Sequence, residues 1–158
     1  MNPPHYQLLF GCSAAFTFLF DRLTKMAAAQ HLLDGSVALF PGCRLTLMLN
    51  TGISFSLFSS TSGVIPWQLT AIIAVIVALL IVAWRFYATS ALADFGFGLI
   101  IGGAIGNFVD RLCIGGVVDF IELYYGCWSW PTFNVADIAI VFGFMCIVGE
   151  SVYEAKNK

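Results

Sequence analysis

Residues 66–86 read PWQLTAIIAVIVALLIVAWRF, and this segment decides the class of fold. It carries no charged residue before Arg85 and is long enough to cross a bilayer as a helix, which takes about 20 apolar residues. In the whole chain of 158 residues, 59% are hydrophobic and 10% are charged, whereas a soluble domain carries about 25% charged residues. Because so few charges cannot solvate the surface of a soluble protein, we expect an integral membrane protein.

Four apolar segments have the length of a membrane span: residues 6–28, 66–86, 92–112 and 134–153. They predict a mainly α fold with four transmembrane helices, formed by residues 1–158 as a single membrane domain. An even number of spans puts both termini on one side of the membrane. The two long loops, about 29–65 and 113–133, then lie on the opposite side and are the outer loops of this prediction.

The first segment also has features of a secretory signal peptide, because Ala27-Ala28-Ala29 offers a small-residue cleavage site. No Lys or Arg precedes its apolar run, however, and Asp21 and Lys25 interrupt the segment before that site. We therefore expect this segment to be a retained first span.

Strand periodicity appears in the first outer loop. Apolar and other residues alternate over 44–49, and they alternate again over 53–58, after Asn50-Thr51-Gly52. This pattern predicts a small extracytoplasmic β element, and the apolar run Val117–Leu123 of the second outer loop could pair with it.

Three glycines spaced four apart lie along the third span, at Gly98, Gly102 and Gly106. Residues at this spacing share one face of a helix. A stripe without side chains allows a neighbouring helix to approach closely, so we expect these glycines to pack against another span.

Composition excludes several classes of protein. The net charge is −2, so there is no basic surface to bind nucleic acid. The five cysteines have no zinc-ligand spacing, although Cys43, Cys113 and Cys127 fall in loops and could pair. His5 and His31 are the only histidines, so no Ser-His-Asp triad competes and a metal site would lack histidine ligands. Carboxylates alone could still hold Mg²⁺ or Ca²⁺.

Ionisable residues are costly inside a membrane, so their positions are informative. Three acidic residues near the side of the termini are expected to snorkel to the interface or to be solvated there: Asp94, Glu150 and Glu154. The remaining polar residues gather near the outer ends of the spans: Asp21, Lys25, Asn50, Asn107, Asp110, Arg111, Asp119, Asn134 and Asp137. Singly, each has a structural explanation, such as a helical ion pair for Asp21 and Lys25 or a capping box for Asn134 and Asp137. Together they predict one polar layer at the outer membrane interface.

Asp119 and Asp137 are both flanked by apolar residues. Two carboxyl groups brought together in apolar surroundings share a proton, and such a pair can activate a water molecule against an amide. The residues alone leave two functions open, an aspartyl hydrolase and a small carboxylate-lined transporter or channel. A third function, that of a purely structural membrane subunit, would not explain why these polar residues gather in one layer.

Five segments resemble, in order, the motifs of the bacterial lipoprotein signal peptidases, the type II signal peptidases of the membrane aspartyl protease class. These segments are Asp21-Arg22-Leu23-Thr24-Lys25, Asn50-Thr51-Gly52-Ile53-Ser54-Phe55, the stretch GGAIGNFVDR at residues 102–111, Val117-Val118-Asp119-Phe120 and Phe133-Asn134-Val135-Ala136-Asp137. Five motifs in order, on four spans of a short chain, make the resemblance specific.

The resemblance implies a multi-pass aspartic endopeptidase of the bacterial cytoplasmic (inner) membrane, with both termini cytoplasmic and the active site near the outer leaflet. It implies cleavage of prolipoproteins just before a diacylglyceryl-modified cysteine, with membrane lipid as the other partner and no metal or other cofactor. We expect a monomer. The implied catalytic residues are Asp119 and Asp137. Those implied to line the site or bind substrate are Asn50, Gly52, Asn107, Asp110, Arg111 and Asn134. Asp21 and Lys25 are implied to support it.

Overall fold

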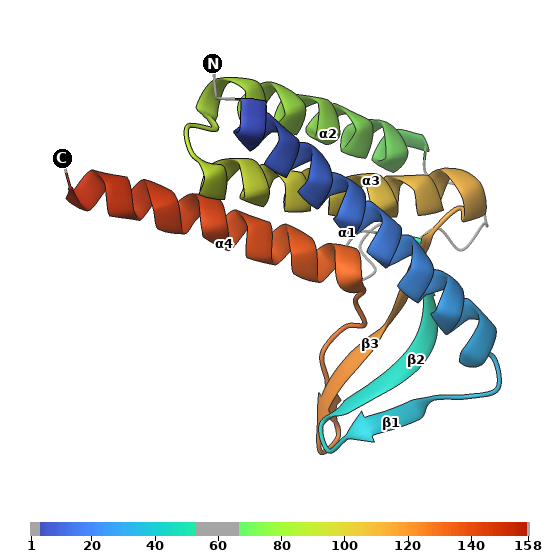
Figure 1. Ribbon diagram of the computed structural model, residues 1–158. Coiled ribbons are helices and arrows are strands. Elements are labelled where there is room, and N and C mark those ends of the chain that lie inside the picture. The colour runs from blue at the N-terminus through green and yellow to red at the C-terminus, as the bar shows by residue number, and fades with distance from the viewer. Residues whose placement is uncertain (1–3, 53–66, 158) are drawn as a thin grey trace.

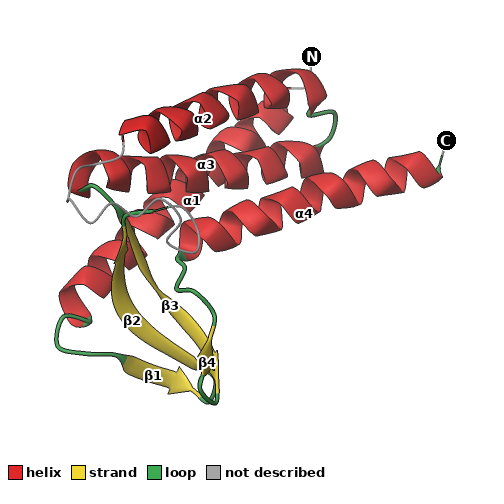
Figure 2. Ribbon diagram, turned by 180° about the vertical axis from the view of Figure 1, so that it is seen from behind, coloured by secondary structure: helices red, strands yellow, loops and turns green. Residues whose placement is uncertain are grey.

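The computed structural model describes residues 4–52 and 67–157. In this part of the chain four long helices form a bundle (Figure 1): α1 (Pro4–His31), α2 (Trp67–Tyr87), α3 (Ala91–Ile114) and α4 (Val135–Lys156). Each begins and ends within three residues of a predicted span, which confirms the predicted helices. Both chain ends lie at one end of the bundle, and a small sheet projects from the other (Figures 1 and 2).

Three of these four helices are long and apolar enough to cross a membrane: α2 from Thr70, α3 and α4. Helix α1 is the longest of the four at 28 residues but does not meet the same criterion. Its C-terminal half contains Asp21, Arg22 and Lys25, which makes that half too polar by composition. The prediction of a mainly helical membrane fold is therefore confirmed, while composition supports three of the four predicted spans.

Helix α3 lies between α1 and α4, and the glycine stripe lets α1 approach it closely. A Cβ atom on Gly98 would stand 2.6 Å from the carbonyl oxygen of Phe10, and one on Gly102 would collide with the carbonyl oxygen of Ala14. A Cβ on Gly106 would lie 2.5 Å from Asp21 Oδ2. The predicted close packing of these glycines is confirmed, and the neighbour is α1.

The face of α1 that meets this stripe is polar, and its residues recur every four positions: Ser13, Thr17, Asp21 and Lys25, all buried. Large apolar residues cover other parts of α1 and are exposed: Leu8, Phe16, Leu19, Phe20, Leu23 and Met26. A helix with its polar side inward and its apolar side outward suits a surrounding of lipid rather than water.

The sheet is antiparallel, in the order β1 (Val37–Phe40), β2 (Cys43–Asn50), β3 (Val117–Tyr125) and β4 (Trp128–Ser129). Strands β2 and β3 pair with Asn50 opposite Val117 and Met48 opposite Asp119, which confirms the predicted pairing of the two outer loops. Residues 53–58, predicted to continue the β element, lie outside the described residues. The sequence did not predict β1, which joins β2 through a turn in which Gly42 has a positive φ of 93°.

The expected solvation of Asp94 is wrong. This carboxylate is fully buried in the first turn of α3, and Trp84 Nε1 donates a 2.7 Å hydrogen bond to its Oδ1. Trp84 belongs to the last turns of α2, so the short connection between α2 and α3 brings a donor to the acid. Glu150 is half-buried and Glu154 is exposed, as expected for that end of the bundle.

Candidate active site

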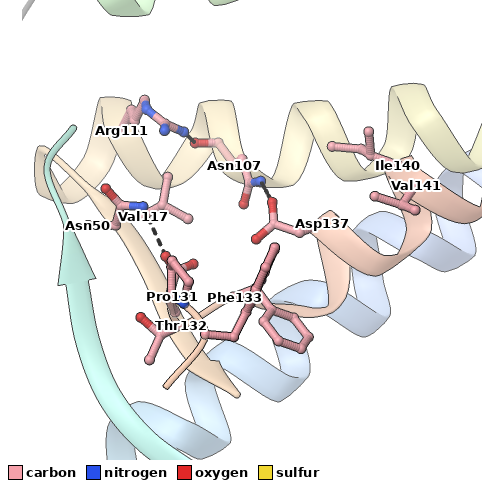
Figure 3. A pocket seen from close by; sticks show the side chains of 12 residues that line it. Asn50, Asn107, Arg111, Val117, Pro131, Thr132, Phe133, Asp137, Ile140 and Val141 are labelled. Atoms are coloured by element: carbon pink, nitrogen blue, oxygen red, sulfur yellow. Dashed lines mark hydrogen bonds between the residues drawn. The ribbon is translucent and has the colours of Figure 1, made fainter. Parts of the chain in front are cut away.

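A cavity of about 430 Å³ opens where α3, α4 and the sheet meet (Figure 3). Asp119 reaches it from β3 and Asp137 from the first turn of α4. The other lining residues are Asn50, Asn107, Arg111, Val117, Trp130, Pro131, Thr132, Phe133, Ile140 and Val141. The two carboxylates predicted to form a pair therefore share one cavity.

Asp119 is 2% exposed and accepts hydrogen bonds at both of its oxygens. Asn134 Nδ2 donates to Oδ1 at 2.6 Å, and Asn50 Nδ2 donates to Oδ2 at 3.0 Å. The pKa of the Asp119 carboxyl is raised from 3.8 to about 6, with burial as the largest cause. The negative charge of Asp137 also raises this pKa, whereas the two amide donors and the charge of Lys25 lower it.

Asp137 is held by the start of α4. Asn134 caps this helix, since its side-chain oxygen accepts from the Asp137 backbone N–H at 3.0 Å and Asp137 Oδ2 accepts from the Asn134 backbone N–H at 3.2 Å. This is the capping box that the sequence offered as a structural explanation. The capping role does not exclude a role in the site, because Asp137 also lines the cavity.

Asn107 connects the charged interior to Asp137. Its Oδ1 accepts from Lys25 Nζ at 2.8 Å and from Asn134 Nδ2 at 3.2 Å, and its Nδ2 donates to Asp137 Oδ1 at 2.9 Å. An ammonium group can only donate, so Lys25 fixes which end of the Asn107 amide faces Asp137.

A buried ion network lies behind this amide. Lys25 Nζ is 2.8 Å from Asp21 Oδ2 and 2.9 Å from Asp110 Oδ2, and Arg22 pairs with the other oxygen of Asp110. Asp21 also accepts a 3.0 Å hydrogen bond from the backbone N–H of Ala136, at the start of α4. Two carboxylates therefore balance two cations, and the network joins α1, α3 and α4.

Arg111 joins α3 to the end of β2. Its guanidinium donates to the carbonyl oxygens of Asn107 at 3.2 Å and Gly52 at 3.3 Å (Figure 3 shows the first contact). The Gly52 backbone N–H in turn donates to Asn50 Oδ1 at 3.1 Å, so the Asn50 amide is oriented with its nitrogen toward Asp119. This is the local reason for an asparagine at position 50.

The structure brings the predicted site residues together in two layers. Five of them line the cavity: Asn50, Asn107, Arg111, Asp119 and Asp137. Asn134 is fully buried and holds Asp119 from behind, and Gly52 contributes backbone groups. Asp21, Lys25 and Asp110 lie behind it and do not line the cavity.

Sequence reasoning missed the role of Arg22 and the wall formed by residues 130–133. Trp130 and Phe133 carry a usable signal, since two aromatic residues flank a proline shortly before the Asn134 cap. All five cysteines lie in the described part of the chain and are unpaired. Within residues 4–52 and 67–157, no three His, Cys, Asp or Glu side chains are grouped so that they could hold a metal ion.

Comparison with known proteins assigns the chain to a family. Residues 13–153 match the family model described as signal peptidase (SPase) II. The chain belongs to the signal peptidase II family. It is therefore a protease of a membrane-enzyme family, which favours the hydrolase over the transporter or channel.

Curated relatives and solved structures agree with the signal peptidase II family. A lipoprotein signal peptidase of Paraburkholderia phymatum is 38% identical over 145 residues, which cover 91% of this chain and 87% of the relative. One of Methylobacterium sp. is 39% identical over 144 residues, covering 89% of this chain and 87% of the relative. A bacterial membrane enzyme solved by the in meso method at 2.3 Å resolution has a TM-score of 0.80 at 27% identity, covering 93% of this chain and 89% of that one.

Proposed function

We propose that this chain removes the signal peptide from prolipoproteins by cleaving just before a diacylglyceryl-modified cysteine, with Asp119 and Asp137 as its acid–base pair. One observation carries the proposal: both carboxylates line one cavity, and asparagine amides hold each of them. Because these amides fix the carboxylates in direction, the pair is preorganised to bind a water molecule between them.

The environments of the two carboxyl groups support different roles. We assign Asp119 the role of the acid, because its pKa is raised to about 6, chiefly by burial. Asp137, which lies in the first turn of α4 and accepts a hydrogen bond from Asn107 Nδ2, is then the base. Two carboxyl groups in one cavity can act as the acid and the base of one reaction.

In the reaction, Asp137 accepts a proton from the bound water, and the water oxygen attacks the scissile carbonyl carbon. Asp119 gives its proton to the carbonyl oxygen, which forms a neutral tetrahedral intermediate. When the C–N bond breaks, Asp137 passes its proton to the leaving amine of the cysteine. The other hydroxyl of the intermediate returns a proton to Asp119, so the products are a carboxylic acid and an amine and the pair is restored.

An apolar groove of about 400 Å³ beside Asp137 supports a lipid-modified substrate. It is lined by Leu123, Trp130, Phe133, Asp137, Ile138, Val141, Phe142 and Met145. The acyl chains of a membrane-anchored precursor can enter this groove without leaving apolar surroundings, and their position there would hold the modified cysteine next to the catalytic pair.

The distribution of polar residues supports a particular placement in the membrane. We infer that α1 is the fourth span, because its charged residues Asp21 and Lys25 face α3 and its apolar residues face outward. The sheet lies at the end of the bundle away from both termini (Figure 1). Because a prolipoprotein is cleaved after its translocation, we place the site near the outer leaflet of the cytoplasmic membrane, with both termini inside.

The test is cleavage of a purified diacylglyceryl precursor, followed by its shift on a gel. Asp119→Asn and Asp137→Asn should each abolish release of the signal peptide while the protein still accumulates in the membrane. Asp34→Asn, which changes an exposed carboxylate outside the helices and strands, is the matched control and should cleave at the wild-type rate. Full turnover by either active-site variant would refute the catalytic assignment.

A further inference from the structure

A second cavity, of about 490 Å³, lies on the sheet next to the catalytic cavity. The two share four lining residues, Asn50, Trp130, Pro131 and Thr132, so they are adjacent. The rest of its wall is formed by Arg44, Thr46, Met48, Leu49, Thr51, Gly52, Glu122 and Ser129. Most of these side chains are polar, unlike those of the apolar groove beside Asp137.

Strand β2 separates two environments. A row of its residues lines the second cavity: Arg44, Thr46, Met48, Leu49 and Asn50. Leu45 and Leu47 instead pack against the apolar cluster of Ala28, Leu32 and Phe120. The row begins at Asn50, which donates to Asp119, and ends at Arg44. At about 3.4 Å per residue it is about 20 Å long, the length of an extended peptide of about six residues.

Arg44 is a fixed donor at the far end of this row. Its Nε and NH2 groups donate to the two oxygens of Glu122 at 2.7 and 2.8 Å, and its guanidinium carbon lies 5.1 Å from the centre of the Tyr124 ring. The Arg44 side chain is 43% exposed although it is held from two sides. A guanidinium has five N–H groups, and the two bonds to Glu122 occupy two of them.

We propose that this second cavity binds the polar segment of the precursor that directly follows the modified cysteine, with Arg44 donating to it. The inference rests on the proposed function. The signal peptide ahead of the cleavage site is apolar and belongs among the spans, and acyl chains belong in the apolar groove. The segment after the cysteine is the part of the substrate that leaves the site toward water, and a polar wall adjacent to the site matches it.

The experiment compares two diacylglyceryl precursors that are identical up to the cysteine. The short one ends two residues after it, and the long one continues for eight residues. We expect wild type to show a lower KM for the long precursor. Arg44→Gln should raise this KM about tenfold, because one charge-assisted hydrogen bond to the substrate is lost. The kcat value and the KM for the short precursor should stay unchanged. Thr46→Trp, which fills the cavity without changing the ion pair, should have the same effect.

Arg85→Gln is the matched control, because it removes an exposed arginine from the end of α2 near the termini. It should leave both KM values unchanged. Equal losses on the two precursors in Arg44→Gln, or equal KM values in wild type, would overturn the inference and leave the proposed function standing. Wild-type enzyme that cleaves neither precursor would overturn the proposed function and the inference with it.

Discussion

Asn134 Nδ2 donates a 2.6 Å hydrogen bond to Asp119 Oδ1. The same residue is the N-cap of α4, and its backbone N–H donates to Asp137 at 3.2 Å. One asparagine therefore starts the helix and connects the two carboxylates of the candidate pair. Any change that moves the start of α4 also moves the pair, so the fold and the chemistry are coupled at this residue.

Asn134→Ser separates these two roles. Serine is also a good N-cap, so α4 should still begin at this residue, and the free energy of unfolding should fall by about 1–3 kcal/mol, the cost of losing the buried hydrogen bonds to Asp119 and Asn107. Serine has no amide to bridge Asp119 and Asn107, so kcat should fall on the order of 100-fold through misplacement of the pair. Both are measured on purified enzyme, by thermal unfolding in detergent and by cleavage of a lipidated precursor.

Ser90→Ala is the control for the cap alone. Ser90 caps α3 by accepting from the Ala93 backbone N–H at 3.1 Å, at the end of the bundle near the termini. Its loss should lower stability by about 1 kcal/mol and leave kcat unchanged. Wild-type kcat in Asn134→Ser would show that the bridging amide has no part in catalysis.

The pH dependence of cleavage should report the protonation of Asp119. Burial raises its pKa to about 6, so the acid form needed to protonate the carbonyl persists up to that pH and is lost above it. We therefore expect kcat/KM to fall as pH rises through this range. Asn50 lowers the pKa by donating to Oδ2, so Asn50→Ala should move the falling limb to higher pH. A limb that stays in place, or moves to lower pH, would contradict this assignment.

Lys25 should be the most costly cation to remove. It is 2% exposed and contacts the carboxylates of Asp21 and Asp110, so Lys25→Met leaves buried negative charge without a partner. Breaking a buried pair from one side costs about 3–5 kcal/mol. Adding Asp21→Asn to Lys25→Met should recover part of this loss, since Arg22 still balances Asp110.

Arg44→Gln provides the comparison for thermal unfolding. Arg44 is 43% exposed, so its pair with Glu122 should contribute about 0–1 kcal/mol. If Lys25→Met costs no more than Arg44→Gln, the buried network does not stabilise the bundle in the way we describe.

The sequence predicts those features that depend on regular spacing. Apolar runs of sufficient length predict the four helices, and the four-residue spacing of Gly98, Gly102 and Gly106 predicts a close helix contact. Alternation in the first outer loop predicts strand β2, and the apolar run Val117–Leu123 of the second outer loop predicts its partner β3. These patterns are local consequences of helix and strand geometry, so they are visible without knowledge of the neighbours.

Features that depend on a neighbour were missed. The burial of Asp94 requires Trp84 from the preceding helix, and no spacing in the sequence shows that hydrogen bond. The polar side of α1 is weakly marked, because Ser13 and Thr17 are common in apolar helices and only the approach of α3 makes them an interface. The residues of the candidate pair were found from their apolar flanks, but their amide partners become evident only in three dimensions.

Gly102→Ala tests whether the helix contact supports the site. A methyl group at Gly102 would collide with the carbonyl oxygen of Ala14, so α1 must shift away from α3. Overpacking of this kind costs about 1–3 kcal/mol. Because α1 also carries Lys25, the shift should weaken its 2.8 Å hydrogen bond to Asn107, and kcat should fall together with the unfolding temperature.

Gly149→Ala is the matched control, since a Cβ there meets nothing within 4 Å. Alanine is the better helix former by about 1 kcal/mol, so this variant should be as stable as wild type or more stable, with unchanged kcat. Gly102→Ala with wild-type stability would show that α1 can shift away from α3 without a cost in stability. A loss of stability without a loss of kcat would show instead that the position of Lys25 does not control the pair.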